Sequence, residues 1–261
     1  MTDPERVRIA VEGGIAEVRL TRGEKHNGLD WRMLVALSEA VDEIAANDEV
    51  RCVILAADGP SFCAGLDFKS FMAGESEGDL TADAFAQRDG EDANFVQRTT
   101  YGWRALPVPV IAALRGACMG GGVQLALAAD VRFAEPTTRM SVMEVRYGLI
   151  PDMGLSQTIA PLLRPDIARE LAYTGRIVEA DEADEIGLVT RLVDDADAAA
   201  RELASQIAER SPEAIRAIKR VATEAWGKPP AEALALEAEL QRGLLGTSAQ
   251  IEAVQRAMSG G

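Results

Sequence analysis

Apolar and polar residues alternate from residue 6 to residue 21, and Gly13-Gly14 interrupts the alternation near its middle. A period of two places apolar side chains on one face of a strand, so two such runs joined by a glycine pair predict a β-hairpin. From residue 31 to 46 the apolar positions recur at helical spacing instead. Asp30 stands at the position where a side chain caps a helix, so the pattern predicts a helix directly after the hairpin.

Two uninterrupted apolar runs, 51–57 and 108–114, have the character of buried strands. Each is followed by a turn of small residues, at 61–67 and at 116–122, and the second turn leads into a good helix-forming stretch at 123–129. Strand, turn and helix in alternation predict parallel strands joined by right-handed crossovers. A chain of 261 residues can hold one large α/β domain and an appendage.

The stretch 73–79 is acidic, polar and rich in glycine, and it predicts a mobile surface loop. A helix is expected after it, from about Thr81 to Leu106, because Pro107 and Pro109 cannot continue a helix.

After Val193 the pattern is helical only, with amphipathic stretches at 194–209, 212–226 and 231–245. Three consecutive helices without strands indicate a separate appendage. The expected organisation is therefore a core over 1–193 and a helical region over 194–261, whereas a self-contained helical cap is the alternative.

The two glycine turns are candidates for chemistry because glycine leaves backbone N–H groups accessible to a ligand. The second turn also opens a helix, whose free N–H groups and dipole favour a negative charge. Two convergent N–H donors, one from each turn, are the requirement of an oxyanion hole. The alternative is that Gly120-Gly121-Gly122 serves only close packing at a strand-to-helix turn.

The net charge of -15 and a pI near 4.6 disfavour nucleic-acid binding, because the overall field repels phosphates. No apolar run approaches the ~20 residues of a membrane helix, and the acidic start resembles neither a signal nor a transit peptide. Cys52, Cys63 and Cys118 lack metal-type spacing and indicate reduced thiols of a cytoplasmic protein. With only His26 present, a histidine-based triad or metal site would depend on that one residue, and no metal site is expected.

The order and spacing of these motifs resemble the crotonase superfamily, the enoyl-CoA hydratase/isomerase family. The matching segments are 18–29 (VRLTRGEKHNGL), both glycine turns, Ala129 to Arg132, 144–154, 174–189 and 211–215. The resemblance implies an α/β fold, a crotonase-like ββα superhelix whose C-terminal helices assemble a homotrimer or a hexamer. It also implies an acyl-CoA thioester substrate and no cofactor, since CoA arrives as part of the substrate.

The same resemblance assigns roles residue by residue. The N–H groups of Ala64 and Gly121 would hold the thioester oxygen, and Glu144 would be the principal acid and base. Substrate or CoA contacts are expected at Arg22, Lys25, Cys63, Leu66, Asp67, Lys69 and Gly120. His26 is expected in a turn near the CoA entrance.

Gln124 departs from the family pattern, which has a second glutamate there to hold the hydrating water. An amide can orient a water molecule but cannot exchange a proton near neutral pH, so one of the two carboxylates used for hydration is missing. Asp152 resembles an aspartate of dienoyl-CoA isomerases and of the dehalogenase branch, although no aromatic-pocket signature of the latter is present. Asp152 could instead cap a helix starting near Gly154, and Glu144 could pair with a neighbouring arginine.

These observations favour an acyl-CoA enzyme that moves a proton along the acyl chain, by double-bond isomerisation or by hydration. One alternative is a dienoyl-CoA isomerase that uses Glu144 and Asp152. Another is a catalytically weakened acyl-CoA-binding subunit, suggested by Gln124 but opposed by the intact Glu144. RNA binding, known in a branch of the family, is disfavoured by the charge.

Overall fold

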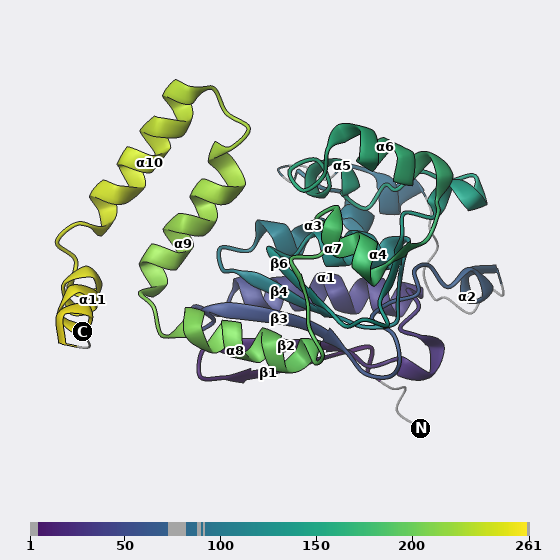
Figure 1. Ribbon diagram of the computed structural model, residues 1–261, viewed down its shortest axis with the longest axis horizontal. Helices are drawn as coiled ribbons and strands as arrows, with labels where there is room; N and C mark the ends of the chain where they lie inside the picture. The colour runs from purple at the N-terminus through teal and green to yellow at the C-terminus, as the bar shows by residue number, and fades with distance from the viewer. Residues whose placement is uncertain (1–4, 73–81, 88–89, 91, 260–261) are drawn as a thin grey trace.

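The computed structural model describes residues 5–72, 82–87, 90 and 92–259, and it shows a mixed α/β architecture (Figure 1). The main sheet has six strands in the order β1-β2-β3-β4-β6-β9. They are β1 (Val7–Glu12), β2 (Ile15–Leu20), β3 (Cys52–Ala57), β4 (Val110–Leu114), β6 (Val131–Ala134) and β9 (Arg191–Leu192). The predicted hairpin is present, because β1 pairs antiparallel with β2, and every other pair in this sheet is parallel, as the alternation of strands and helices predicts.

Helices cover both faces of this sheet, which is why β3 is buried along its whole length. Val53 and Leu55 belong to the core shared with α1 (Trp31–Ala45) and α3 (Phe95–Ala105). Cys52 and Ile54 point to the other face, against the alanines that α8 (Ala196–Ala208) presents every four residues. The helix α1 begins as predicted, since Asp30 caps it by accepting a hydrogen bond from the Met33 N–H at 2.8 Å.

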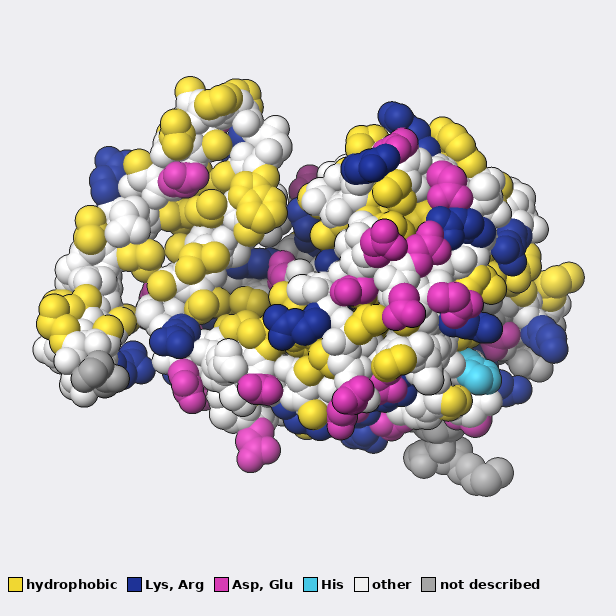
Figure 2. Space-filling view, in the orientation of Figure 1, with side chains coloured by type: hydrophobic (Ala, Val, Ile, Leu, Met, Phe, Trp, Pro, Cys, Tyr) yellow, Lys and Arg dark blue, Asp and Glu magenta, His cyan; other side chains and the backbone are white. Residues whose placement is uncertain are grey.

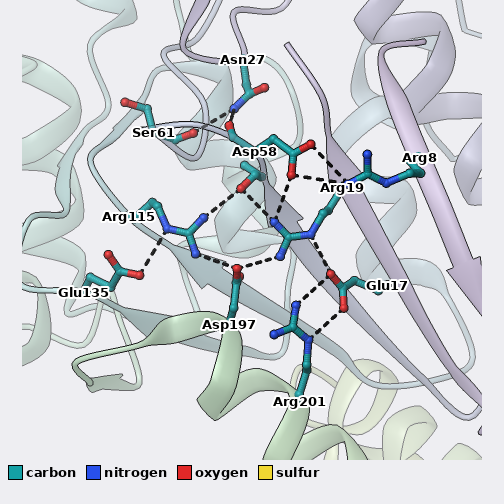
Figure 3. A network of polar contacts seen from close by, with 11 residues as sticks. Arg8, Glu17, Arg19, Asn27, Asp58, Ser61, Arg115, Glu135, Asp197 and Arg201 are labelled. Carbon is teal, nitrogen blue, oxygen red and sulfur yellow. Dashed lines mark hydrogen bonds and ion pairs between the residues drawn. The ribbon is translucent and has the colours of Figure 1, made fainter. Parts of the chain in front are cut away.

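A partly buried network of ion pairs fixes α8 to the sheet (Figure 3). Asp197 lies between two arginines, with Arg19 Nη2 at 2.7 Å and Arg115 Nη2 at 2.8 Å from its Oδ2. Glu17 binds both Arg19 and Arg201, so the network continues from the sheet to the exposed side of α8. The helix α8 is therefore part of the core, and the predicted boundary at residue 194 is too early.

A three-stranded sheet and several short helices stand beside the main sheet, and they carry the site. The small sheet has the order β5-β7-β8, formed by β5 (Ala117–Met119), β7 (Arg139–Ser141) and β8 (Val178–Glu179). The short elements are η1 (Gly23–Lys25), α2 (Phe68–Met72), η2 (Ala82–Phe85), α4 (Gly121–Leu127), η3 (Glu144–Tyr147), α5 (Leu155–Thr158), α6 (Pro165–Thr174) and α7 (Ala180–Glu185). The structure thus confirms the predicted α/β class.

The last helices project away from the core (Figure 1). They are α9 (Pro212–Arg220), the π-helical turn η4 (Val221–Ala225), α10 (Pro230–Leu244) and α11 (Ser248–Ser259). The helix α9 is attached to the core by Lys219, whose Nζ lies 2.7 Å from Asp130 Oδ2. The sequence predicted three terminal helices and missed α11. Hydrophobic side chains gather on this projecting lobe, and a hollow separates part of it from the body (Figure 2).

The single helix predicted from about Thr81 to Leu106 is wrong. The structure has the short η2 and then α3, which starts only after Asn94. The Asn94 side chain accepts from the Gln97 N–H while the Gln97 side chain accepts from the Asn94 N–H, and this capping box begins a new helix. The loop predicted over 73–79 lies outside the described residues. Among the helices that are described, none is both long and apolar enough to cross a membrane.

Candidate active site

The two glycine turns lie side by side, joined by backbone hydrogen bonds. Cys63 and Cys118 form a parallel bridge, in which the Cys63 N–H donates to Ala117 O at 3.0 Å and the Met119 N–H donates to Cys63 O at 2.9 Å. Such a close approach leaves no room for side chains. A Cβ atom on Gly122 would lie 2.3 Å from Cys63 O, and one on Gly65 would lie 2.6 Å from Met119 O. These two glycines therefore serve packing, which was the alternative considered for the triplet.

Gly121 differs from its neighbours in what surrounds it. The atoms nearest to a Cβ there would be side-chain atoms, Leu29 Cδ1 at 2.7 Å and Met153 Sδ at 2.9 Å. Gly121 is the first residue of α4, so its N–H has no acceptor within the helix. Among the described residues no other acceptor is bonded to it either. The triplet thus combines a packing glycine with a free donor.

The structure contradicts the assignment of the Ala64 N–H as the other donor. That N–H already donates to His26 O at 2.9 Å, in a contact that ties the first turn to the loop before α1. His26 and Asn27 shape this loop by adopting left-handed backbone conformations, with φ near +51° and +52°. His26 lies in a turn, as expected, and its Nδ1 is 2.9 Å from Ser61 Oγ.

Leu66 carries a free N–H in the same turn. Gly65 O accepts from the Leu29 N–H at 2.8 Å, and the Asp67 N–H donates to Leu29 O at 3.0 Å. Because the N–H and C=O of a trans peptide point in opposite directions, the Leu66 N–H points away from Leu29. No described residue accepts a hydrogen bond from it, and Leu66 lines the same cavity as Gly121.

That cavity holds about 180 Å³ and is walled mainly by apolar side chains. The candidate residues Ala64, Leu66, Gly120, Gly121, Gln124, Glu144 and Asp152 all line it. Phe68 and Tyr147 also line it, and their rings contact each other with centroids 4.7 Å apart. The sequence analysis did not single out either ring, although both lie within three residues of a predicted site residue.

Gln124 is buried in α4, and both ends of its amide are engaged. Its Oε1 accepts from the Met153 N–H at 2.9 Å, and its Nε2 donates to Glu144 Oε1 at 2.6 Å. Because the Met153 N–H can only donate and the Glu144 carboxylate accepts, the oxygen and the nitrogen of the Gln124 amide can be told apart. Gln124 therefore holds the Glu144 carboxylate directly, in the place where a second acid would face it.

Glu144 keeps one oxygen without a partner. Its Oε2 is buried, and no described residue forms a hydrogen bond to it. Burial raises the pKa of Glu144, the nearby charge of Asp152 adds to the increase, and the hydrogen bond from Gln124 opposes it. Burial also raises the pKa of Asp152. Two carboxyl groups with raised pKa values beside one cavity are suited to proton transfer.

The alternatives considered for these two acids do not fit the geometry. The helix α5 starts after Gly154, and no side chain caps it, so Asp152 is not its N-cap. Within the described part of the chain, Glu144 forms no ion pair with Arg139 or Arg146.

A second, more open cleft lies on the other side of the first turn. It is shared with the cavity at Ala64, Gly65, Leu66 and Phe68, and it is also lined by Arg22, Lys25, Asp67 and Lys69. The lysines are exposed. Arg22 is buried, and its guanidinium donates to Asp67 Oδ2 at 2.8 Å and to Gly28 O at 3.0 Å. Lys25 and Lys69 are thus available to a ligand, whereas Arg22 and Asp67 bond each other.

The predicted ligand contact at Cys63 is wrong. Its side chain is fully buried between the turns, its Sγ donates to Asn27 O, and burial raises its pKa to about 12. The bridge to the second turn puts this side chain in the core. Among the described residues no cluster of metal-ligating side chains is present.

Comparisons with known proteins show the family of the chain. The enoyl-CoA hydratase/isomerase family model matches residues 10–256. YngF of Bacillus subtilis, which carries a provisional enoyl-CoA hydratase/isomerase name, is 35% identical over 92% of this chain and 90% of its own. Mouse mitochondrial Delta(3,5)-Delta(2,4)-dienoyl-CoA isomerase is 33% identical over 94% of this chain and 76% of its own. The crystal structure of an enoyl-CoA hydratase from Bacillus anthracis superposes with a TM-score of 0.87 at 29% identity, covering 98% of this chain and 96% of that one.

Proposed function

The chain belongs to the enoyl-CoA hydratase/isomerase family and is an acyl-CoA enzyme, and from this premise we propose that it isomerises a double bond of an enoyl-CoA, with Glu144 as its acid and base. The observation that carries the proposal is the hydrogen bond between Gln124 and Glu144. It leaves Oε2 of this cavity-lining glutamate without a hydrogen-bond partner, and Gln124 occupies the position from which a second carboxylate would activate water.

In the proposed reaction the thioester oxygen accepts hydrogen bonds from the Leu66 and Gly121 N–H groups, which replace the pair predicted from sequence. Glu144 Oε2 removes a proton from the carbon next to the thioester of a 3-enoyl group, and the two donors stabilise the resulting enolate. Glu144 then returns that proton two carbons further along the chain, which gives the 2-enoyl product. One proton is moved, no electron is exchanged, and neither a metal nor a redox cofactor is required.

The substrate's CoA portion is proposed to occupy the open cleft, where Lys25 and Lys69 can meet its phosphates. The thioester would then cross the shared wall at Leu66 and place the acyl group in the apolar cavity. The two hollows meet at that turn, which supports this path. A cytoplasmic location is proposed on the three unpaired, buried cysteines.

A second candidate is a dienoyl-CoA isomerase, favoured by the position of Asp152 in the same cavity as Glu144. Two acids at different places along the acyl chain could remove and return a proton over a longer distance. The mouse relative of that name supports this alternative. The free oxygen of Glu144 opposes the third reading, a subunit that binds acyl-CoA without turning it over.

The proposal is tested by kcat/KM on 3-enoyl-, 2-enoyl- and 3,5-dienoyl-CoA. Wild-type protein should isomerise the 3-enoyl substrate and hydrate the 2-enoyl substrate slowly. Glu144→Gln should lower isomerisation by about 10³, within the range for losing a general base. Gln124→Glu should gain hydration because it restores a second carboxylate. Rapid hydration by wild type that Glu144→Gln leaves unchanged would refute both assignments, and a large loss on 3,5-dienoyl-CoA in Asp152→Asn would favour the second candidate.

We further propose that the projecting helices assemble copies of this chain into a trimer or hexamer. Trp226, Leu234 and Leu245 on this lobe are 77%, 61% and 61% exposed, more than an isolated subunit normally leaves in water. Light scattering should give a trimer or hexamer for the wild type. Leu234→Glu should shift the oligomeric state toward the monomer while leaving the circular dichroism spectrum unchanged. A monomeric wild type at micromolar concentration would refute the assembly.

A further inference from the structure

The cavity assigned to the acyl group has an unbalanced set of charges. Its described lining includes two acids, Glu144 and Asp152, and no lysine, arginine or histidine. The open cleft beyond the shared turn has the opposite balance, because Lys25, Lys69 and Arg22 face the single acid Asp67. The two ends of one ligand would therefore meet surroundings of opposite charge.

Among the described residues, no cation forms an ion pair with either acid of the cavity. Glu144 is bound by the uncharged amide of Gln124, and Asp152 forms no ion pair with a described residue. Most of the other described lining residues are apolar, including Leu34, Val96 and Met143. A charged group that left water for this cavity would lose its hydration without gaining a partner of opposite sign.

Arg22 and Arg176 are two described cations that cannot turn toward the cavity without breaking other contacts. Arg22 is held by Asp67 and by Gly28 O. Arg176, which follows α6, is paired with Glu170 and Glu182, both at 2.6 Å. An anionic group would instead add a further negative charge beside Glu144 and Asp152, and repulsion between like charges is strong where burial lowers the effective dielectric constant.

We propose that the cavity accepts only uncharged hydrocarbon acyl groups and that it excludes acyl groups ending in a carboxylate. This inference rests on the proposed function, since it names the substrate class of the same site. It follows from the side chains of the wall and does not depend on which reaction Glu144 performs.

The test compares two saturated ligands that this chemistry cannot transform, hexanoyl-CoA and adipyl-CoA. They have the same six-carbon length and differ only in ending with a methyl group or a carboxylate. Isothermal titration calorimetry of the wild-type protein at pH 8 should show adipyl-CoA binding roughly 100-fold more weakly, because its carboxylate is desolvated without a counter-ion. At pH 5 the difference should shrink several-fold, since the adipyl carboxyl and the two acids of the cavity are then protonated to a larger extent.

Ile150→Lys provides a gain-of-function arm, because Ile150 lines the cavity while 74% of it is exposed, so a lysine there can reach both water and ligand. It should tighten adipyl-CoA at least tenfold relative to hexanoyl-CoA, because only adipyl-CoA carries a carboxylate that the lysine can bind. Tyr173→Lys, equally exposed at 74% but outside the lining, is the matched control and should change neither. Equal affinity of wild type for both ligands would overturn the inference and leave the acyl-CoA function standing. Failure to bind either ligand would overturn both.

Discussion

The cavity and the more open cleft share one wall, yet they are lined by different kinds of side chain. The cavity is small and apolar, and its acids have raised pKa values because they are buried. The cleft is wider, and its free cations, Lys25 and Lys69, are exposed. Solvent screens charges in the cleft, whereas burial strengthens electrostatic effects in the cavity. A change in the cavity should therefore alter the chemical step, and a change in the cleft should alter binding weakly.

The largest of these effects is expected in the cavity, from Gly121→Pro. Proline removes the free N–H while its backbone suits the first position of a helix. We expect kcat to fall by about 10²–10³, the usual loss for one oxyanion donor. Gly121→Ala is the matched control, since it adds the same Cβ against Leu29 and Met153 but keeps the N–H. Steady-state rates on folded variants check this, and wild-type rates in Gly121→Pro would show that this donor does not act.

A smaller effect is expected from pH. Glu144 must be ionised to act as a base, and burial raises its pKa. The kcat/KM for isomerisation should therefore fall tenfold per pH unit on the acid side, starting above the pKa of an ordinary glutamate. Asp152→Asn removes the neighbouring negative charge, so it should lower the pKa of Glu144 and shift this limb to lower pH. A limb that stays in place in Asp152→Asn would show that the two acids are not coupled.

The same raised pKa has a consequence for stability. A carboxyl group whose pKa is higher in the folded protein favours folding when protonated, and this contribution is lost as pH rises through that pKa. Relative to wild type, Glu144→Gln should therefore raise the thermal unfolding midpoint more at pH 8 than at pH 5. An increase of the same size at both pH values would mean that the ionisation of Glu144 does not destabilise the fold.

The smallest effect is expected in the cleft. Lys69→Gln and Lys25→Gln should each raise the KM for an acyl-CoA only a few-fold, with kcat unchanged, because exposed ion pairs contribute little. The increase should disappear as salt is raised toward 1 M. A fall in kcat, or an effect that salt does not diminish, would place these lysines closer to the reacting group than the proposal allows.

The sequence alone determined the features that depend on local pattern. The alternation around Gly13-Gly14 predicted the hairpin, Asp30 predicted the start of α1, and the two apolar runs predicted β3 and β4. The motif order also predicted the family, which the comparisons confirm. Local pattern failed where a side chain broke it, as Asn94 does by starting α3 with a capping box.

Only the tertiary structure decided which groups in the two turns are free. The sequence shows glycines at both turns, but not that His26 O occupies the Ala64 N–H or that the Leu66 N–H is left without a partner. Gln124 could be recognised as a departure from the family, but its contacts with Glu144 and Met153 join segments 20 and 29 residues away in the chain. Likewise, α8 and α10 are both amphipathic, yet only α8 is buried against the sheet. Hydrogen-bond partners and burial depend on which distant segments meet in space, and the local pattern of residues does not specify that.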